Sequence, residues 1–398
     1  MNENDDVLIF GDNVNICRKI IGALSKQGIN ASMPIVAGRG VDDDIFRVVE
    51  FLKERQLVLV FQNEKLKKIT EIFHCRGITE LYIYPWDTHF IDNNNINKCF
   101  LKIDNNKPRL DYVEIEISET CNLNCKGCSE FSNLVEGKKF TDINRFRSDL
   151  IKLKKYFWGI GKIRLLGGEP LTNPDYPTFV AIARELFPDS DIRLVSNGLL
   201  IPLQDKEKLA AIKYYNCSFD ISNYPPTKKR IDMIKSCLNK ADIKYNISIP
   251  VKIFFKTILS EPLESSSESY NNCMFSYCHS LRDGCLSACT TPLYIDRLNK
   301  AFHLTYPTDD KICLDQTDLN GWEINESFEK PHDFCRYCSK GLVSFKWRIC
   351  PGIEAKPEDW IIKRTIFNAM IIPITQKPFK PFAERLRYIL QSPRRKRK

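Results

Sequence analysis

The chain has 398 residues, of which 43% are hydrophobic and 27% are charged, a composition typical of a globular protein with two or three domains. No stretch approaches the roughly 20 apolar residues of a membrane-spanning helix. The acidic start, Met1–Asp6, predicts a cytoplasmic protein without a signal peptide. The net charge of +9 belongs to residues 361–398, which hold eleven Lys or Arg and one acid, so no nucleic-acid partner is predicted.

The first segment, residues 1–105, alternates short apolar strands with helical patterns, which predicts a Rossmann-like α/β domain. Gly11 follows the first strand as in a dinucleotide-binding turn, but the further glycines of that motif are missing. A domain that binds no nucleotide, or that docks a partner, is therefore favoured. The Asn-rich and Asp-rich run over 93–108 predicts a linker. Strands are expected at Val7–Phe10, Leu57–Phe61 and Leu81–Tyr84, and helices at 14–27, 44–55 and 64–75.

The second segment, residues 110–260, repeats β/α units of about 25 to 30 residues, which predicts an α/β fold with a partial (β/α)6 TIM-like barrel. A cysteine-rich extension follows over 265–355, and a basic tail over 361–398. Strands of the barrel are expected at 112–117, 162–166, 191–195, 217–221 and 245–255.

The 16 cysteines point to metal or cluster ligation, because disulfides are rare in a reducing compartment. Cys121, Cys125 and Cys128 form a C-x3-C-x2-C motif directly after the first barrel strand. Soft thiolates suit iron–sulfur clusters, and three of them leave one iron open to another ligand. Structural zinc and chance clustering are the alternatives, although zinc prefers paired C-x2-C knuckles.

Two further motifs close the next two strands. Gly167-Gly168-Glu169-Pro170 ends one strand, and Ser196-Asn197-Gly198 ends the following strand. The carboxyl ends of barrel strands meet at the active-site face, so both motifs are expected beside the cysteine loop.

Together the three motifs resemble the radical S-adenosylmethionine (SAM) superfamily. The resemblance implies a [4Fe–4S] cluster on the three cysteines, whose open iron binds the amino and carboxylate groups of SAM. It also implies reductive cleavage of SAM to a 5′-deoxyadenosyl radical that abstracts hydrogen from a substrate carbon. Gly127 departs from the family pattern, which usually has an aromatic residue before the third cysteine. The implied cofactor contacts are Gly167, Gly168, Glu169, Pro170, Ser196 and Asn197.

A second cysteine group resembles the auxiliary-cluster extension of many radical SAM enzymes. The resemblance implies a second [4Fe–4S] cluster, and zinc in the same site stays open as an alternative. Other cysteines could replace a ligand or donate a hydrogen atom to a substrate radical. The implied ligands are Cys278, Cys289, Cys335 and Cys338, and the remaining candidates are Cys273, Cys285, Cys313 and Cys350.

An N-terminal α/β domain with one auxiliary-cluster extension resembles bacterial radical enzymes associated with surface-glycan biosynthesis. This resemblance implies a sugar or glycan precursor as substrate, with epimerisation, oxidation or dehydration as the outcome. Two alternatives remain: a peptide-modifying radical SAM maturase, and a non-catalytic iron–sulfur or zinc protein. The expected partner is an electron donor such as flavodoxin or ferredoxin. The basic tail is either a membrane-surface contact for anionic lipids or a solvated terminus.

Overall fold

A computed structural model describes residues 6–33, 44, 48, 52, 56–61, 63–84, 100–273 and 275–362. The expected helix at 44–55 lies almost entirely outside the described residues. The first part of the expected linker, 93–99, and the basic tail beyond residue 362 also lie outside them. Among the described residues, no helix is long and apolar enough to cross a membrane.

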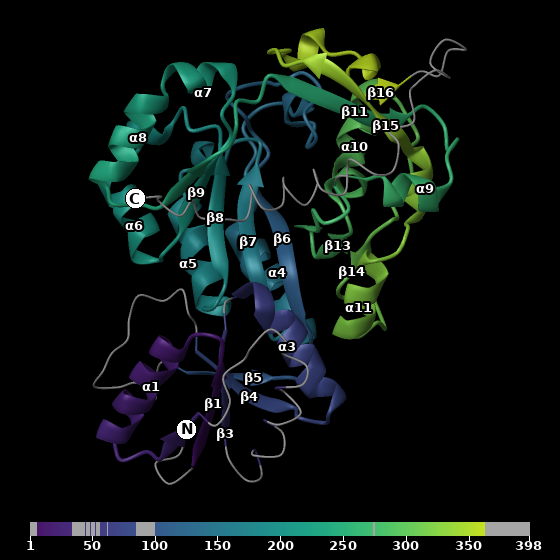
Figure 1. Cartoon of the computed structure of the whole chain (residues 1–398). Helices are drawn as coiled ribbons and strands as arrows, with labels where there is room; N and C mark the ends of the chain where they lie inside the picture. Colours follow the sequence, from purple (N-terminus) through teal and green to yellow (C-terminus); the bar gives the residue numbers. More distant parts are fainter. Residues whose placement is uncertain are drawn as a thin grey trace.

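The N-terminal sheet has five strands in the order β2-β1-β3-β4-β5 and is drawn in purple and blue in Figure 1. Four of its strands are parallel, and α1 and α3 cover its two faces through separate apolar clusters. The structure has a strand, β5, within the expected linker. Leu101 and Ile103 alternate there with polar residues, and the strand pairs antiparallel with β4. The elements are β1 Val7–Gly11, α1 Val14–Lys26, β2 Ala31–Ser32, β3 Gln56–Val60, α3 Asn63–Cys75, β4 Glu80–Ile83 and β5 Leu101–Asp104.

The central sheet has the order β10-β9-β8-β7-β6-β12-β13-β14 and is open rather than closed. β6 to β10 are parallel, and helices α4, α5, α6 and α8 bury the main apolar core against one face. The α/β prediction with a partial barrel is confirmed. The elements are β6 Arg109–Ser118, α4 Ile143–Tyr156, β7 Gly159–Gly167, α5 Tyr176–Leu186, β8 Asp191–Ser196, α6 Lys206–Tyr214, β9 Ser218–Ile221, α7 Pro225–Lys229, α8 Ile231–Lys240 and β10 Tyr245–Ile247.

The expected strand over 245–255 is two strands in the structure. β10 ends at Ile247, Pro250 follows without an amide hydrogen to donate, and β11 (Ile253–Leu259) joins a separate sheet with the order β15-β11-β16. On the side of β6 away from β7, the neighbouring strand is β12, which pairs parallel with β6. Figure 1 shows β11 and β15 above the carboxyl ends of the central strands.

The C-terminal part contributes short strands and helices beside β6. Its elements are α9 Ser266–Asn271, β12 Ser280–Arg282, β13 Cys285–Ser287, α10 Thr290–Phe302, β14 Ile312–Cys313, α11 Gly321–Phe328, β15 Cys338–Lys346 and β16 Ile361–Ile362. Short 3-10 turns lie at Ser132–Leu134, Pro170–Thr172, Ile201–Leu203, Asp333–Tyr337, Gly352–Glu354 and Pro357–Asp359.

Candidate functional site

The first cysteine motif lies in the loop between β6 and α4. Its three thiols belong to one small cluster of apolar side chains, in which Cys125 is only 8% exposed. Cys128 interacts electrostatically with both other thiols, so the three sulfur atoms lie near one another. The sequence prediction that this motif forms one group therefore agrees with the geometry.

Residues from the end of the described chain cover this loop. The Trp347 indole donates a hydrogen bond to Cys125 Sγ at 3.2 Å, and the Trp360 indole donates to the Cys128 carbonyl at 2.8 Å. Gly127 has a positive φ of 62°, and a Cβ there would lie 2.6 Å from Cζ of Phe345. The aromatic ring of Phe345 thus lies beside Gly127, the position where the family has an aromatic residue.

The GGEP segment is joined to the cysteine loop by its backbone. Gly168 N donates to Ser118 O at 2.7 Å, and Glu169 N donates to Thr120 O at 2.9 Å. A Cβ on Gly167 would lie 2.0 Å from Ser118 O, and a Cβ on Gly168 would lie 2.5 Å from Thr120 O. The two glycines are therefore required by the close approach of two chain segments, independently of any ligand.

The Glu169 carboxylate joins GGEP to the next motif. It is fully buried and accepts hydrogen bonds from Ser196 Oγ at 2.7 Å, Asn197 N at 2.8 Å and Leu171 N at 3.2 Å. Burial raises the pKa of Glu169 to about 7, although these three donors oppose the shift. The side chain thus fixes the turn after β8.

The third motif returns to the cysteine loop. Asn197 Nδ2 donates to Asn122 Oδ1 at 2.7 Å, and Asn122 lies between the first two cysteines. Hydrogen bonds thus connect all three motifs at the carboxyl ends of β6, β7 and β8, the edge of the sheet where the sequence places them.

The donor set of the loop fits an iron–sulfur cluster. Burial raises the pKa of Cys121 and Cys128 and brings that of Cys125 to about 12, so binding a soft metal centre would displace their protons. In the part of the chain that the structure describes, no three His, Cys, Asp or Glu side chains are close enough to hold one ion. Three thiols in one loop are the donors of an iron–sulfur cluster with an open iron.

Arg297 on α10 is a residue of this site that the sequence alone does not reveal. Its guanidinium donates to both Glu116 carboxylate oxygens, at 3.0 and 2.6 Å, and to the Glu130 carbonyl at 2.8 Å. It also lies 3.2 Å from Glu119. Arg297 therefore holds the chain on both sides of the cysteine loop. No local pattern marks this role, since the contacts span more than 160 residues.

The second cysteine group gathers four thiols from three segments. Desolvation is the main cause that raises the pKa of Cys289, and the nearby thiols of Cys273, Cys335 and Cys338 raise it further. Cys338 likewise interacts with Cys273 and Cys335.

Cys278 lies differently from these four thiols. Its strongest electrostatic neighbours are Glu114 and Arg164 on the central sheet, followed by Cys273. The geometry therefore favours Cys273 over Cys278 as the fourth member of the group.

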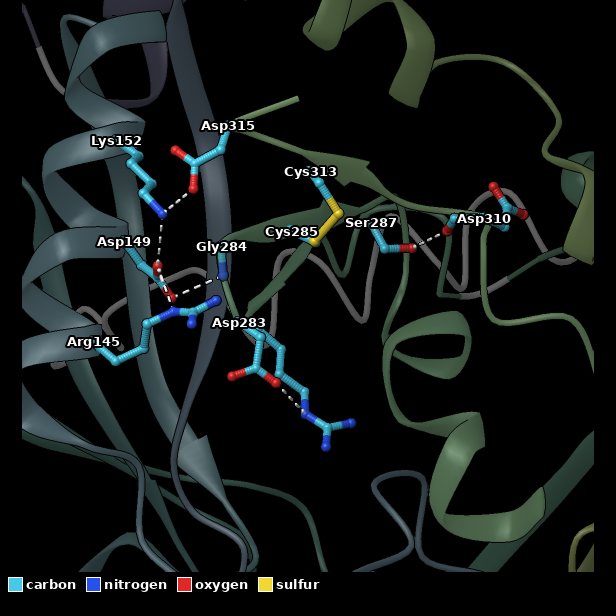
Figure 2. Close-up of a disulfide and its surroundings, with 11 residues drawn as sticks. Arg145, Asp149, Lys152, Asp283, Gly284, Cys285, Ser287, Asp310, Cys313 and Asp315 are labelled. Atoms are coloured by element: carbon cyan, nitrogen blue, oxygen red, sulfur yellow. Dashed lines mark hydrogen bonds and ion pairs between the residues drawn. A yellow bond between two sulfur atoms is a disulfide. The ribbon is translucent and has the colours of Figure 1, made fainter. Parts of the chain in front are cut away.

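Cys285 and Cys313 are paired with each other. They face one another on β13 and β14 and form a disulfide with Cα atoms 3.9 Å apart, shown in Figure 2. The sequence alone predicts no disulfide here and offers both cysteines as substitute ligands of the second cluster. Cys350 is buried beside the first cysteine loop, where its backbone N–H donates to Asn124 O at 2.7 Å.

Comparison with known proteins agrees with this site. Residues 115–231 match the model of the Radical SAM superfamily. The chain carries a radical SAM domain. Such a domain implies a [4Fe–4S] cluster and SAM as cofactors, and the match contains all three motifs described above.

Curated relatives are similar over part of their length. A GTP 3′,8-cyclase of Clostridium acetobutylicum is 33% identical over 165 residues, which cover 38% of this chain and 48% of the relative. One of Aliarcobacter butzleri is 25% identical over 263 residues, which cover 58% of this chain and 76% of the relative. The chain thus spans about half the length of most of the first relatives.

Solved structures are more distant. BtrN in complex with AdoMet and 2-DOIA has a TM-score of 0.39 and 13% identity, and covers 60% of this chain and all of that chain. The anSMEcpe structure with bound AdoMet has a TM-score of 0.28 and 16% identity, and covers 34% of this chain and 42% of that chain.

Proposed function

We propose that this chain is a radical SAM enzyme that cleaves SAM reductively and abstracts hydrogen from a substrate carbon. Cys121, Cys125 and Cys128 would hold the [4Fe–4S] cluster. A bound and reduced cluster supplies the electron that breaks the sulfonium bond of SAM, giving methionine and a 5′-deoxyadenosyl radical. The observation that carries the proposal is the hydrogen-bonded junction of the cysteine loop with GGEP and with Ser196-Asn197.

The residues of this junction have distinct tasks in the proposal. Gly167, Gly168 and Pro170 would present backbone at the cofactor, since their loop lies directly against the cysteine loop. Glu169 would orient Ser196 and Asn197, because its carboxylate is already bound to both. Trp347 and Trp360, which bond to the Cys125 sulfur and the Cys128 carbonyl, would help to exclude water from the cluster.

We further propose that Cys273, Cys289, Cys335 and Cys338 hold a second [4Fe–4S] cluster. Four thiols from three segments give a fully ligated site, which suits electron transfer or structural support. In this arrangement Cys278 is not a ligand, in contrast to the assignment based on sequence alone.

For the substrate we propose a sugar carbon, either in a glycan precursor or in a nucleotide. The names of the curated relatives describe a cyclisation of GTP, which supports the nucleotide. We also propose a cytoplasmic location and a protein electron donor such as flavodoxin or ferredoxin, because the cleavage needs an electron from outside.

The deciding experiment uses anaerobically purified protein reconstituted with iron and sulfide. After reduction with dithionite, SAM is added and 5′-deoxyadenosine is measured by mass spectrometry. Its formation supports the proposal, and the same assay with nucleotides and nucleotide sugars identifies the substrate by increased turnover. No 5′-deoxyadenosine from protein with about eight irons per chain, with or without these substrates, would reject the proposal.

A further inference from the structure

The small sheet of β11 and β15 has two different faces. Phe254, Phe345 and Trp347 point to the cysteine loop, where Phe254 packs in the same apolar cluster as the three thiols. Tyr224 joins this aromatic layer, with its ring 5.7 Å from Trp347 and 5.9 Å from Phe254. The inner face of this small sheet therefore packs against the cysteine loop.

The opposite face carries exposed apolar and basic side chains. Ile253 is 52% exposed and Phe255 is 40% exposed. Lys346 pairs with Ile253 across the two strands, and Arg348 follows two residues later. We call these four residues the outer face. Contiguous exposed apolar residues of this kind mark interaction surfaces.

The charge of the outer face is one-sided. Its charged residues are Lys346 and Arg348, both of them basic. Lys346 and Arg348 form no ion pair with any described residue. A cavity of about 580 Å³ opens at the edge of this face and is lined by Lys252, Ile253, Lys346 and Trp347 among others. The complement of such a surface is an acidic partner with apolar side chains.

The outer face is also one layer from the proposed cluster. Ile349 forms a β-bridge with Cys125, and Lys126 N donates to Arg348 O at 2.9 Å. Trp347, which lines the cavity, donates to the Cys125 sulfur. The aromatic ring of Trp347 and its hydrogen bond would then connect a protein bound here to Cys125, a ligand of the proposed cluster. Redox partners bind through small interfaces of less than about 1,200 Å² in total, so a short two-stranded sheet can supply a large part of one.

We propose that the outer face is the docking surface for an acidic one-electron carrier protein. This inference rests on the proposed function and names the surface through which the electron arrives. The step moves one electron from the reduced carrier, which is thereby oxidised, to the cluster held by Cys121, Cys125 and Cys128. No bond or proton moves in this step.

The test compares two reductants on the reconstituted full chain. The double variant Lys346→Glu and Arg348→Glu reverses the charge of the outer face. We expect the rate of 5′-deoxyadenosine formation driven by a reduced, acidic flavodoxin to fall at least about tenfold at low salt. The rate driven by dithionite, which needs no docking, stays unchanged. Lys206→Glu, an exposed lysine on α6, is the control and leaves both rates unchanged.

The ratio of the flavodoxin-driven to the dithionite-driven rate is the readout, so a partly damaged variant does not imitate the effect. An unchanged ratio in the double variant overturns the docking surface. Calorimetric titration of the chain with flavodoxin gives an independent measure, with at least about tenfold weaker binding expected for the variant. Weaker binding to anionic vesicles alone, with flavodoxin binding intact, also overturns it. Absence of dithionite-driven cleavage in the unmodified chain rejects the proposed function instead, while the titration still tests the surface.

Discussion

The two cysteine groups differ in how the chain brings them together. Cys121, Cys125 and Cys128 share one loop, whereas the second group joins Cys273 and Cys289 to the distant pair Cys335 and Cys338. The first group has its spacing built into the sequence, and the fold only covers it. The second group exists only after three segments have met, so its formation includes the entropy of closing long loops. A local group can be recognised from spacing, and a dispersed group has to be found in the fold.

The largest expected effect comes from the local group. In Cys121→Ala two thiolates remain, which hold a cluster poorly, so 5′-deoxyadenosine formation is abolished and the iron content falls by about four atoms per chain. Mass spectrometry and iron analysis of the reconstituted variant measure both. Cys217→Ala, a buried cysteine outside both groups, is the control and keeps its iron. Full activity of Cys121→Ala would contradict the assignment.

Paired serine variants separate the two candidates for the dispersed group. Cys273→Ser is expected to lose the second cluster, leaving about four irons per chain. Cys278→Ser keeps about eight, because its thiol lies toward Glu114 and Arg164 rather than toward the other three ligands. Iron and sulfide analysis decides between them. The opposite pattern would restore the ligand set inferred from sequence.

Arg297 connects the two groups, since it lies on α10, whose N-cap residue is Cys289. Arg297→Met leaves the buried Glu116 carboxylate without its partner and is expected to lower the free energy of unfolding by about 3–5 kcal/mol. Urea unfolding of the metal-free protein measures it. Arg147→Met, which breaks the exposed pair with Glu185, is the matched control and should leave stability unchanged. Equal losses in the two variants would show that Arg297 has no special part in holding the loop.

The smallest expected effect is the pH dependence at Glu169. Its pKa rises from 4.5 to about 7 on folding, so the folded state binds this proton more tightly than the unfolded state. Stability is therefore highest below pH 4.5 and falls as pH rises to about 7, by up to about 3 kcal/mol. Glu169→Gln cannot titrate and lacks this decline. Urea unfolding of both proteins between pH 4.5 and 8 compares the slopes, and identical slopes would contradict the prediction.

Local features could be predicted from the sequence, and long-range features could not. The strand-end positions of GGEP and Ser196-Asn197 follow from the β/α rhythm, so their meeting beside the cysteine loop was expected. The cover by Trp347 and the Arg297 contacts join segments more than 160 residues apart, and no periodicity encodes them. The break at Pro250 is visible in the sequence, yet the partner of β11 is not.

The aromatic cover has a consequence for the timing of cluster insertion. Trp347 follows Cys125 by 222 residues, and Trp360 follows Cys128 by 232 residues. At a translation rate of 5–20 residues per second, the thiol loop emerges roughly 10 to 45 seconds before the residues that close over it. The thiol loop of the ribosome-bound chain is thus uncovered during this interval. In a chain that folded without its cluster, Trp347 and Trp360 would have to move before a cluster could bind.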